Sequence, residues 1–136
     1  MRFLIVFLCI SNGVWSQNLE KHQWKERVIV IAANAENIDE AEQQFELFLK
    51  KREELIDRRI VLYKCIKKQC TFYNWKDHPK TMRVNTSHQV FKIELIGLDG
   101  GLKYQSNTIE KPQVVLDLID LMPMRRQELK ANTKND

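Results

Sequence analysis

Apolar residues fall along the first half of the chain in a pattern that predicts a strand, a helix and a second strand. Residues 27–33, RVIVIAA, form a β-branched run without alternation, which is typical of a central strand buried on both faces. Apolar positions then recur at helical spacing from Ile38 to Ile56 and predict one amphipathic helix, with Asn37 as its N-cap and Glu40 completing a capping box. Residues 59–65, RIVLYKC, predict the second strand, which a right-handed crossover makes parallel to the first.

The second half of the chain predicts a hairpin after a long excursion. Residues 66–88 break every periodicity, so we expect mainly an irregular excursion, of a length that is often functional. Residues 90–98, VFKIELIGL, begin in strict alternation and predict a strand. Asp99 and Gly100 are the signal of a two-residue type I′ turn, after which the chain returns antiparallel from Gly101.

A closing helix follows, and the order of elements then predicts the fold class. Pro112 marks the first turn of this helix, and Pro123 ends or kinks it. The stripe that we expect this helix to bury comprises Val114, Val115, Leu118, Ile119 and Met122. The order β-α-β-excursion-β-β-α predicts an α/β protein with a thioredoxin-like fold, in which a mixed four-stranded sheet carries helices on both faces.

The start of the chain adds a targeting signal to this picture. Arg2 precedes an unbroken apolar run from Phe3 to Ile10, which is far shorter than the ~20 residues of a membrane span. We therefore expect cleavage after Ser16, a secreted or periplasmic location and no transmembrane segment in the mature chain. The expected division of the chain is a signal peptide over 1–16, an N-terminal arm over 17–26, a thioredoxin-like domain over 27–129 and a flexible tail over 130–136. We expect His22 to be exposed in the arm.

Charge is spread unevenly and points to a polar partner on one flank. The net charge is +4, and basic residues are concentrated in the stretch from Lys64 to Lys92, which also contains Phe72, Tyr73 and Trp75. Such a stretch can mimic a nucleic-acid surface, but export argues against nucleic acid and favours an anionic glycan or an extracellular protein. The cations that we single out for this binding are Lys64, Lys67, Lys68, Arg125 and Arg126. Asn85 begins a glycosylation sequon, which matters in a eukaryotic source.

The two arginines lie in the segment Met122 to Arg126, which leaves two interpretations open. In the first, they pair with helix carboxylates such as Asp117 or Asp120 and hold a seam of C-terminal helices. In the second, their forked donors bind an anion or a protein partner at a corner of the molecule.

Cys65 and Cys70 are the two cysteines that follow the expected cleavage site. Residues five apart in one strand lie ~16 Å apart, whereas the Cα atoms of a disulfide lie within ~7 Å, so a bridge requires the chain to turn between them. Three alternatives stay open: a structural bridge, two free or differently paired thiols, and a reactive pair. The reactive pair stays open because nearby lysines lower the pKa of a thiol. Together with His78 and His88, the cysteines match no common zinc spacing, so we expect neither metal nor cofactor.

Several segments resemble one known family, the P-DUDES domain. The likeness is carried by residues 97–103, GLDGGLK, and residues 118–128, LIDLMPMRRQE, together with Trp24, residues 27–30 and the pair Asp57-Arg58. This peroxiredoxin-like domain of unknown function is found in short exported bacterial proteins and in vertebrate extracellular-matrix proteins, including sushi-repeat proteins. The resemblance implies a thioredoxin-like fold outside the cytoplasm and suggests adhesion or protein binding, with no established reaction.

The usual chemistry of a thioredoxin-like fold needs a thiolate directly after the first strand, where the start of the next helix lowers its pKa. Residues 32–37, AANAEN, contain no Cys, and no Ser or Thr to replace it. We therefore expect a non-catalytic binding or structural module without an active-site cysteine. The alternative is a thiol-disulfide or peroxide-handling protein that uses Cys65 and Cys70.

Overall fold

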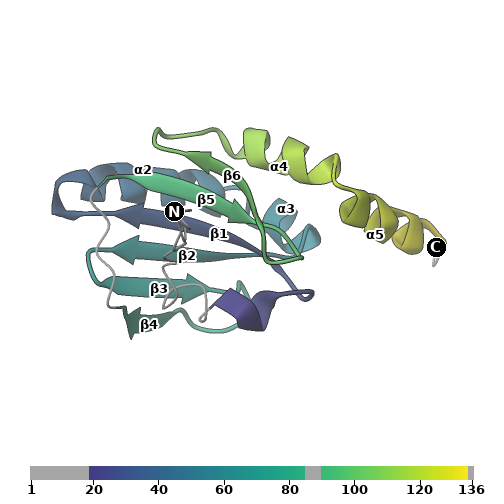
Figure 1. Cartoon of the computed structure of the whole chain (residues 1–136), viewed down its shortest axis with the longest axis horizontal. Coiled ribbons are helices and arrows are strands. Elements are labelled where there is room, and N and C mark those ends of the chain that lie inside the picture. The colour runs from purple at the N-terminus through teal and green to yellow at the C-terminus, as the bar shows by residue number, and fades with distance from the viewer. Residues whose placement is uncertain (1–18, 85–89, 135–136) are drawn as a thin grey trace, which may run out of the picture.

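The computed structural model describes residues 19–84 and 90–134, which form one mixed sheet with helices around it (Figure 1). The predicted cleavage site at Ser16 and the sequon at Asn85 lie outside the described residues. The strands are β1 (Arg27–Ala33), β2 (Ile60–Ile66), β3 (Gln69–Tyr73), β4 (Lys80–Arg83), β5 (Lys92–Ile96) and β6 (Leu102–Ser106). The helices are the 3-10 turns η1 (Glu20–His22) and η2 (Ala35–Asn37) and the α-helices α2 (Ile38–Leu49), α3 (Arg52–Asp57), α4 (Pro112–Asp120) and α5 (Pro123–Lys134).

Strand β1 lies at the centre of the sheet, as the sequence predicted. Every residue of β1 is buried. The strand order is β4-β3-β2-β1-β5-β6, in which β1 and β2 are parallel and every other neighbouring pair is antiparallel. In register, Ile29 lies between Leu62 of β2 and Leu95 of β5. The continuous β-branched run therefore predicted a strand with neighbours on both edges and side chains buried on both faces.

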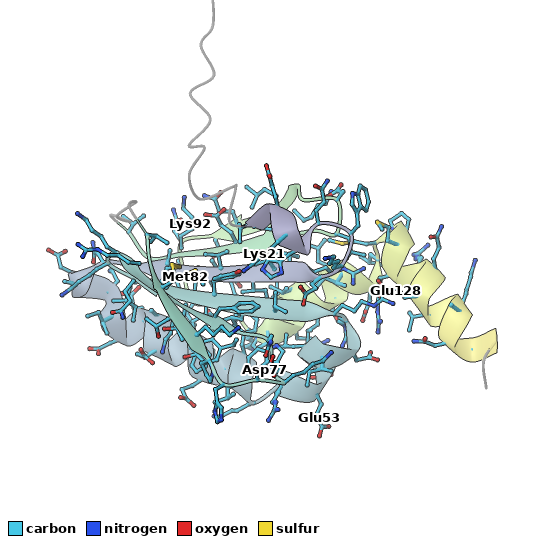
Figure 2. All side chains as sticks on the ribbon, turned by 90° about the horizontal axis from the view of Figure 1, so that it is seen from below. Lys21, Glu53, Asp77, Met82, Lys92 and Glu128 are labelled. Carbon is cyan, nitrogen blue, oxygen red and sulfur yellow. A yellow bond between two sulfur atoms is a disulfide. The ribbon has the colours of Figure 1, made fainter. Side chains whose placement is uncertain are left out.

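The helices do not cover both faces of the sheet, so this part of the fold prediction is wrong. One core gathers Ile29 and Ile31 of β1 with side chains of α2, α3 and α4. The opposite face carries Val28 and Val30, and among the described residues η1 is the helical element on that side, as Figure 2 shows. The reason is that the chain between β2 and β5 forms strands, where a thioredoxin-like order would place a crossing helix.

The excursion predicted over residues 66–88 contains β3 and β4, so the sheet has six strands and the expected four is a second error. The chain leaves β2 through a two-residue turn, Lys67-Lys68, in which Lys67 has φ 58°. This region of φ favours glycine, and a lysine there gives no turn signal in the sequence. Tyr73 then pairs with Leu62, so β3 adds to the edge of β2 although its outer side chains are polar.

The helix predicted from Ile38 to Ile56 is two helices, because Lys50 and Lys51 interrupt it between α2 and α3. Its start also differs from the prediction, since Asn37 makes no side-chain capping bond. The capping residue is Asn34, whose side-chain oxygen accepts hydrogen bonds from the N–H groups of Glu36 and Asn37 at 2.9 and 3.2 Å. The extra turn η2 therefore fills the gap between β1 and α2.

The hairpin between β5 and β6 has a three-residue loop instead of the predicted type I′ turn. The N–H of Gly97 donates to the carbonyl of Gly101, and the N–H of Gly100 donates to the carbonyl of Gly97. Gly100 has φ 83°, but Asp99 does not have the positive φ that a type I′ turn needs. Asp99 instead accepts a hydrogen bond from the N–H of Gly101 through its side chain at 2.9 Å, which favours the wider loop.

Helix α4 begins at Pro112, as predicted, and ends before Pro123, which begins α5. The face that α4 buries is rotated from the predicted one: Leu116 is fully buried, whereas Val114 is 42% exposed. Helix α5 projects past the end of the sheet (Figure 1). Within the described ranges, none of the helices has the length and apolar character needed to cross a membrane.

Candidate functional site

A hollow of about 590 Å³ lies between α2, the start of α3 and the end of β3. Helix α2 contributes Phe45 and Leu49, and the start of α3 contributes Arg52. The rest of the wall comes from Tyr73 and the segment 75–79, which links β3 to β4. We call this hollow the aromatic pocket.

Three aromatic rings give the pocket its apolar floor. The ring centroids of Phe45 and Tyr73 are 4.6 Å apart, and those of Tyr73 and Trp75 are 6.0 Å apart in a stacked arrangement. The Nζ atom of Lys64 lies 4.6 Å from the Phe45 ring centroid and also pairs with Glu42 of α2 at 3.0 Å. Rings fixed against one another in this way offer a rigid surface to a flat, partly apolar ligand.

Trp75 is held in place by contacts with two other elements. Its indole Nε1–H donates to the carbonyl of Ile60 in β2 at 2.8 Å, and its own carbonyl accepts from Nη2 of Arg52 at 2.7 Å. Trp75 has φ 70°, a conformation that costs a bulky residue about 1–3 kcal/mol and persists only where neighbours enforce it. Asn74 enforces it from within the loop, because its side-chain oxygen accepts from the N–H groups of Lys76 and Asp77.

The rim of the pocket is mainly basic. Arg52, Lys76 and His78 line it together with a single acid, Asp77. The carboxylate of Asp77 already accepts a hydrogen bond from the side-chain amide of Asn74 at 3.0 Å. An apolar aromatic floor with cations at its edge suits a ligand that combines a flat carbon skeleton with negative charge.

Cys65 and Cys70 lie on the face of the sheet opposite α2 and form a disulfide, with their Cα atoms 4.0 Å apart. The chain turns back at Lys67-Lys68, so Cys65 and Cys70 face each other in the antiparallel pairing of β2 and β3. The sequence predicts such a turn if the two cysteines are bridged. Both cysteines are fully buried. Lys64, one of the lysines expected beside them, lies on the helix-bearing face instead, where it contacts α2.

Next to the disulfide on β2, Tyr63 begins a short buried chain of hydrogen bonds. Its hydroxyl lies 2.6 Å from Nε2 of His22, and Nδ1 of His22 lies 2.7 Å from a carboxylate oxygen of Glu26. His22 is therefore buried, contrary to the expectation of an exposed arm residue, because η1 packs it against Tyr63 and Phe72. Burial, with a smaller contribution from Glu26, raises the pKa of Tyr63 to about 12.

Three arginines and three acids form a charged cluster at the end of the sheet where α5 begins. Its members are Arg27, Asp57, Arg58, Asp120, Arg125 and Glu128. Arg125 is buried, donates to Asp57 at 2.6 Å and lies 3.5 Å from Asp120. Arg126 is exposed, so the two arginines singled out together have different surroundings. All six residues belong to segments that the sequence analysis singled out, and in the structure they join α3, α4, α5 and β1.

The structure separates the cations that the sequence grouped as binding candidates. Lys67 and Lys68 are exposed in the β2–β3 turn, Lys64 is paired with Glu42, and Arg125 lies inside the charged cluster. The sequence did single out Tyr73 and Trp75, but Phe72 points to the other face, toward Tyr63. Arg52 was missed because only the tertiary fold brings α3 to the β3–β4 segment. No group of three metal-binding side chains occurs among the residues that the structure describes.

Comparison with known families places the chain in one of them. Residues 18–128, which include all six strands, match a domain of unknown function, DUF4174. The match spans most of the 136 residues, so the chain belongs to this family. No curated protein and no solved structure matches it.

Proposed function

We propose that this protein is an extracytoplasmic, non-catalytic binding domain whose aromatic pocket holds an anionic glycan. The observation that carries the proposal is the stacked pair Tyr73 and Trp75 beneath a basic rim. The faces of a sugar ring present C–H groups, which pack favourably against the electron-rich face of an aromatic ring. Sulfate or carboxylate groups on the same sugar would lie within reach of Arg52, Lys76 and His78.

The proposed location outside the cytoplasm rests on the expected signal peptide and on the disulfide. Disulfides persist in oxidising compartments and are rare in the cytosol, so the Cys65–Cys70 bridge is consistent with export. We also propose the finer family name, P-DUDES, and a thioredoxin-like core. The support for that core is that four strands lie in the order β2-β1-β5-β6, with α2 and α4 packed against them. Strands β3 and β4 extend this sheet beyond β2.

The redox alternative has weaker support. Exchange at a disulfide requires a thiolate to reach one of its sulfur atoms. Cys65 and Cys70 are both fully buried, and the loop after β1 offers no replacement cysteine. A structural role therefore fits their surroundings better than a catalytic one.

The test is binding of the secreted protein to immobilised heparin, a sulfated glycan, over a range of salt concentrations. Lys76→Gln, on the pocket rim, is expected to weaken binding by about threefold to fivefold, the range of an exposed charge contact. Lys21→Gln is the matched control, since it removes the same charge on the opposite face of the sheet, where Figure 2 shows Lys21 far from Asp77 of the pocket. Equal weakening by both variants would mean that only net charge matters and would refute the pocket.

A further inference from the structure

Trp75 lines a second hollow in addition to the aromatic pocket. This second hollow, of about 300 Å³, lies between the start of β1 and the loop after β3. Its lining includes Lys25, Ile56 and Arg59, and it shares Trp75 and Lys76 with the aromatic pocket. The two hollows therefore meet at these shared residues.

Cations line both hollows. Arg52 belongs to the aromatic pocket, Lys25 and Arg59 to the second hollow, and Lys76 to both. None of these four forms an ion pair with another residue in the described part of the chain. Of the two acids in the lining, Glu26 contacts His22 at 2.7 Å and Asp77 contacts Asn74 at 3.0 Å. The charge of the combined groove is thus positive on both sides of an aromatic centre.

We infer that the groove binds a linear acidic polysaccharide, which crosses Trp75 with one sugar ring against the indole and acidic groups in both hollows. This inference rests on the proposed function and adds to it a second subsite and a path for the polysaccharide from one hollow to the other. A single small sugar can occupy one hollow only, so it cannot use the cations of both. A longer chain reaches Lys25 and Arg59 as well as Arg52, and gains affinity from the second set without a second binding event.

The test is a length series of heparin fragments, from disaccharide to octasaccharide, titrated into the full secreted protein while Trp fluorescence is followed. The octasaccharide is expected to bind more tightly than the disaccharide. Arg59→Gln is expected to weaken octasaccharide binding by about threefold to fivefold and to leave disaccharide binding unchanged. Lys25→Gln serves as a second variant of the same hollow, and Arg126→Gln, an exposed arginine on α5, is the matched control.

The possible outcomes separate this inference from the function on which it rests. Equal affinity for all fragment lengths, or equal effects of Arg59→Gln and Arg126→Gln, would overturn the second subsite and leave the aromatic pocket standing. Failure of every fragment to bind would overturn both. Poly-glutamate that binds as tightly as the octasaccharide would overturn the sugar as ligand, because it carries charge but no ring to pack on Trp75.

Discussion

Arg58 and Asp120 form a two-pronged ion pair that joins the end of α3 to the end of α4. Nε of Arg58 lies 2.9 Å from one carboxylate oxygen of Asp120, and Nη2 lies 2.9 Å from the other. The two residues are 62 positions apart in the chain. Arg58 also donates to the carbonyl of Glu54, which fixes its side chain along α3. Paired, parallel bonds of this kind are geometrically specific, so they orient α4 and the start of α5 against the sheet.

Asp120→Asn is therefore expected to destabilise the protein. The amide keeps the shape of the carboxylate but loses its charge and one acceptor, which leaves part of the Arg58 fork unpaired. We expect a loss of about 1–2 kcal/mol in the free energy of unfolding, since the pair is partly exposed and water screens it. Urea denaturation measures this loss. Asp117→Asn, the same change on the exposed side of α4, is the control and is expected to cost much less.

The same pair predicts how stability changes in acid. The hydrogen bond from Arg58 lowers the pKa of Asp120 below its ordinary value of 3.8, with help from the charge of Arg125. A lowered pKa in the folded state means that the unfolded chain takes up its proton first. The contribution of Asp120 is therefore present above pH 3.8 and is lost as the pH falls through the folded-state pKa. The melting temperature is therefore expected to fall less steeply with decreasing pH, from neutral pH to below pH 3.8, for Asp120→Asn than for the native protein.

The parts of the fold that depend on local pattern were predictable from the sequence. The run of β-branched residues in β1 and the proline at the start of α4 each specify their element without help from distant residues. Strands β3 and β4 were missed, since the turn before β3 uses a lysine with positive φ and β4 is a short strand of mostly exposed residues. A strand that forms by adding to an existing edge has little signal of its own.

The candidate site was predictable only in part. The aromatic residues among the lysines pointed to Tyr73 and Trp75, but the pocket also needs Phe45 and Arg52 from α2 and α3. For Arg125, sequence proximity suggested Asp117 or Asp120 as partners. Asp120 is one of its partners, at 3.5 Å, but its shortest contact is with Asp57, 68 residues away, at 2.6 Å. Such pairings depend on how α5 crosses the end of the sheet, which no local pattern encodes.

The disulfide is expected to be structural. Thiol labelling of the native, unreduced protein should detect no free cysteine, and the protein should not reduce insulin or consume peroxide. Replacing both Cys65 and Cys70 by Ala should lower the free energy of unfolding by about 2 kcal/mol, as for a bridge that closes a short loop. Insulin reduction by the native protein that disappears in this double variant would instead establish the redox alternative.

Tyr63→Phe tests the buried contact between η1 and β2. The change removes the hydroxyl that lies 2.6 Å from Nε2 of His22 and leaves that buried nitrogen without its partner. We expect a loss of about 1–3 kcal/mol in the free energy of unfolding, the cost of an unsatisfied buried polar group. Tyr104→Phe, on β6, is the control, because Tyr104 is only partly buried. Equal losses in the two variants would contradict a special role for the His22 contact.

The raised pKa of Tyr63 gives this contact a signature in alkaline solution. The unfolded chain ionises a tyrosine near pH 10, whereas the folded protein holds Tyr63 protonated up to about pH 12. The unfolded state thus loses its proton first, so the contribution of Tyr63 is full below pH 10 and falls as the pH rises toward 12. Stability measured across this range should decline more steeply in the native protein than in Tyr63→Phe. Absorbance titration should likewise show a tyrosine step near pH 12 in the folded native protein that is missing in folded Tyr63→Phe, and parallel curves for the two proteins would refute the assignment.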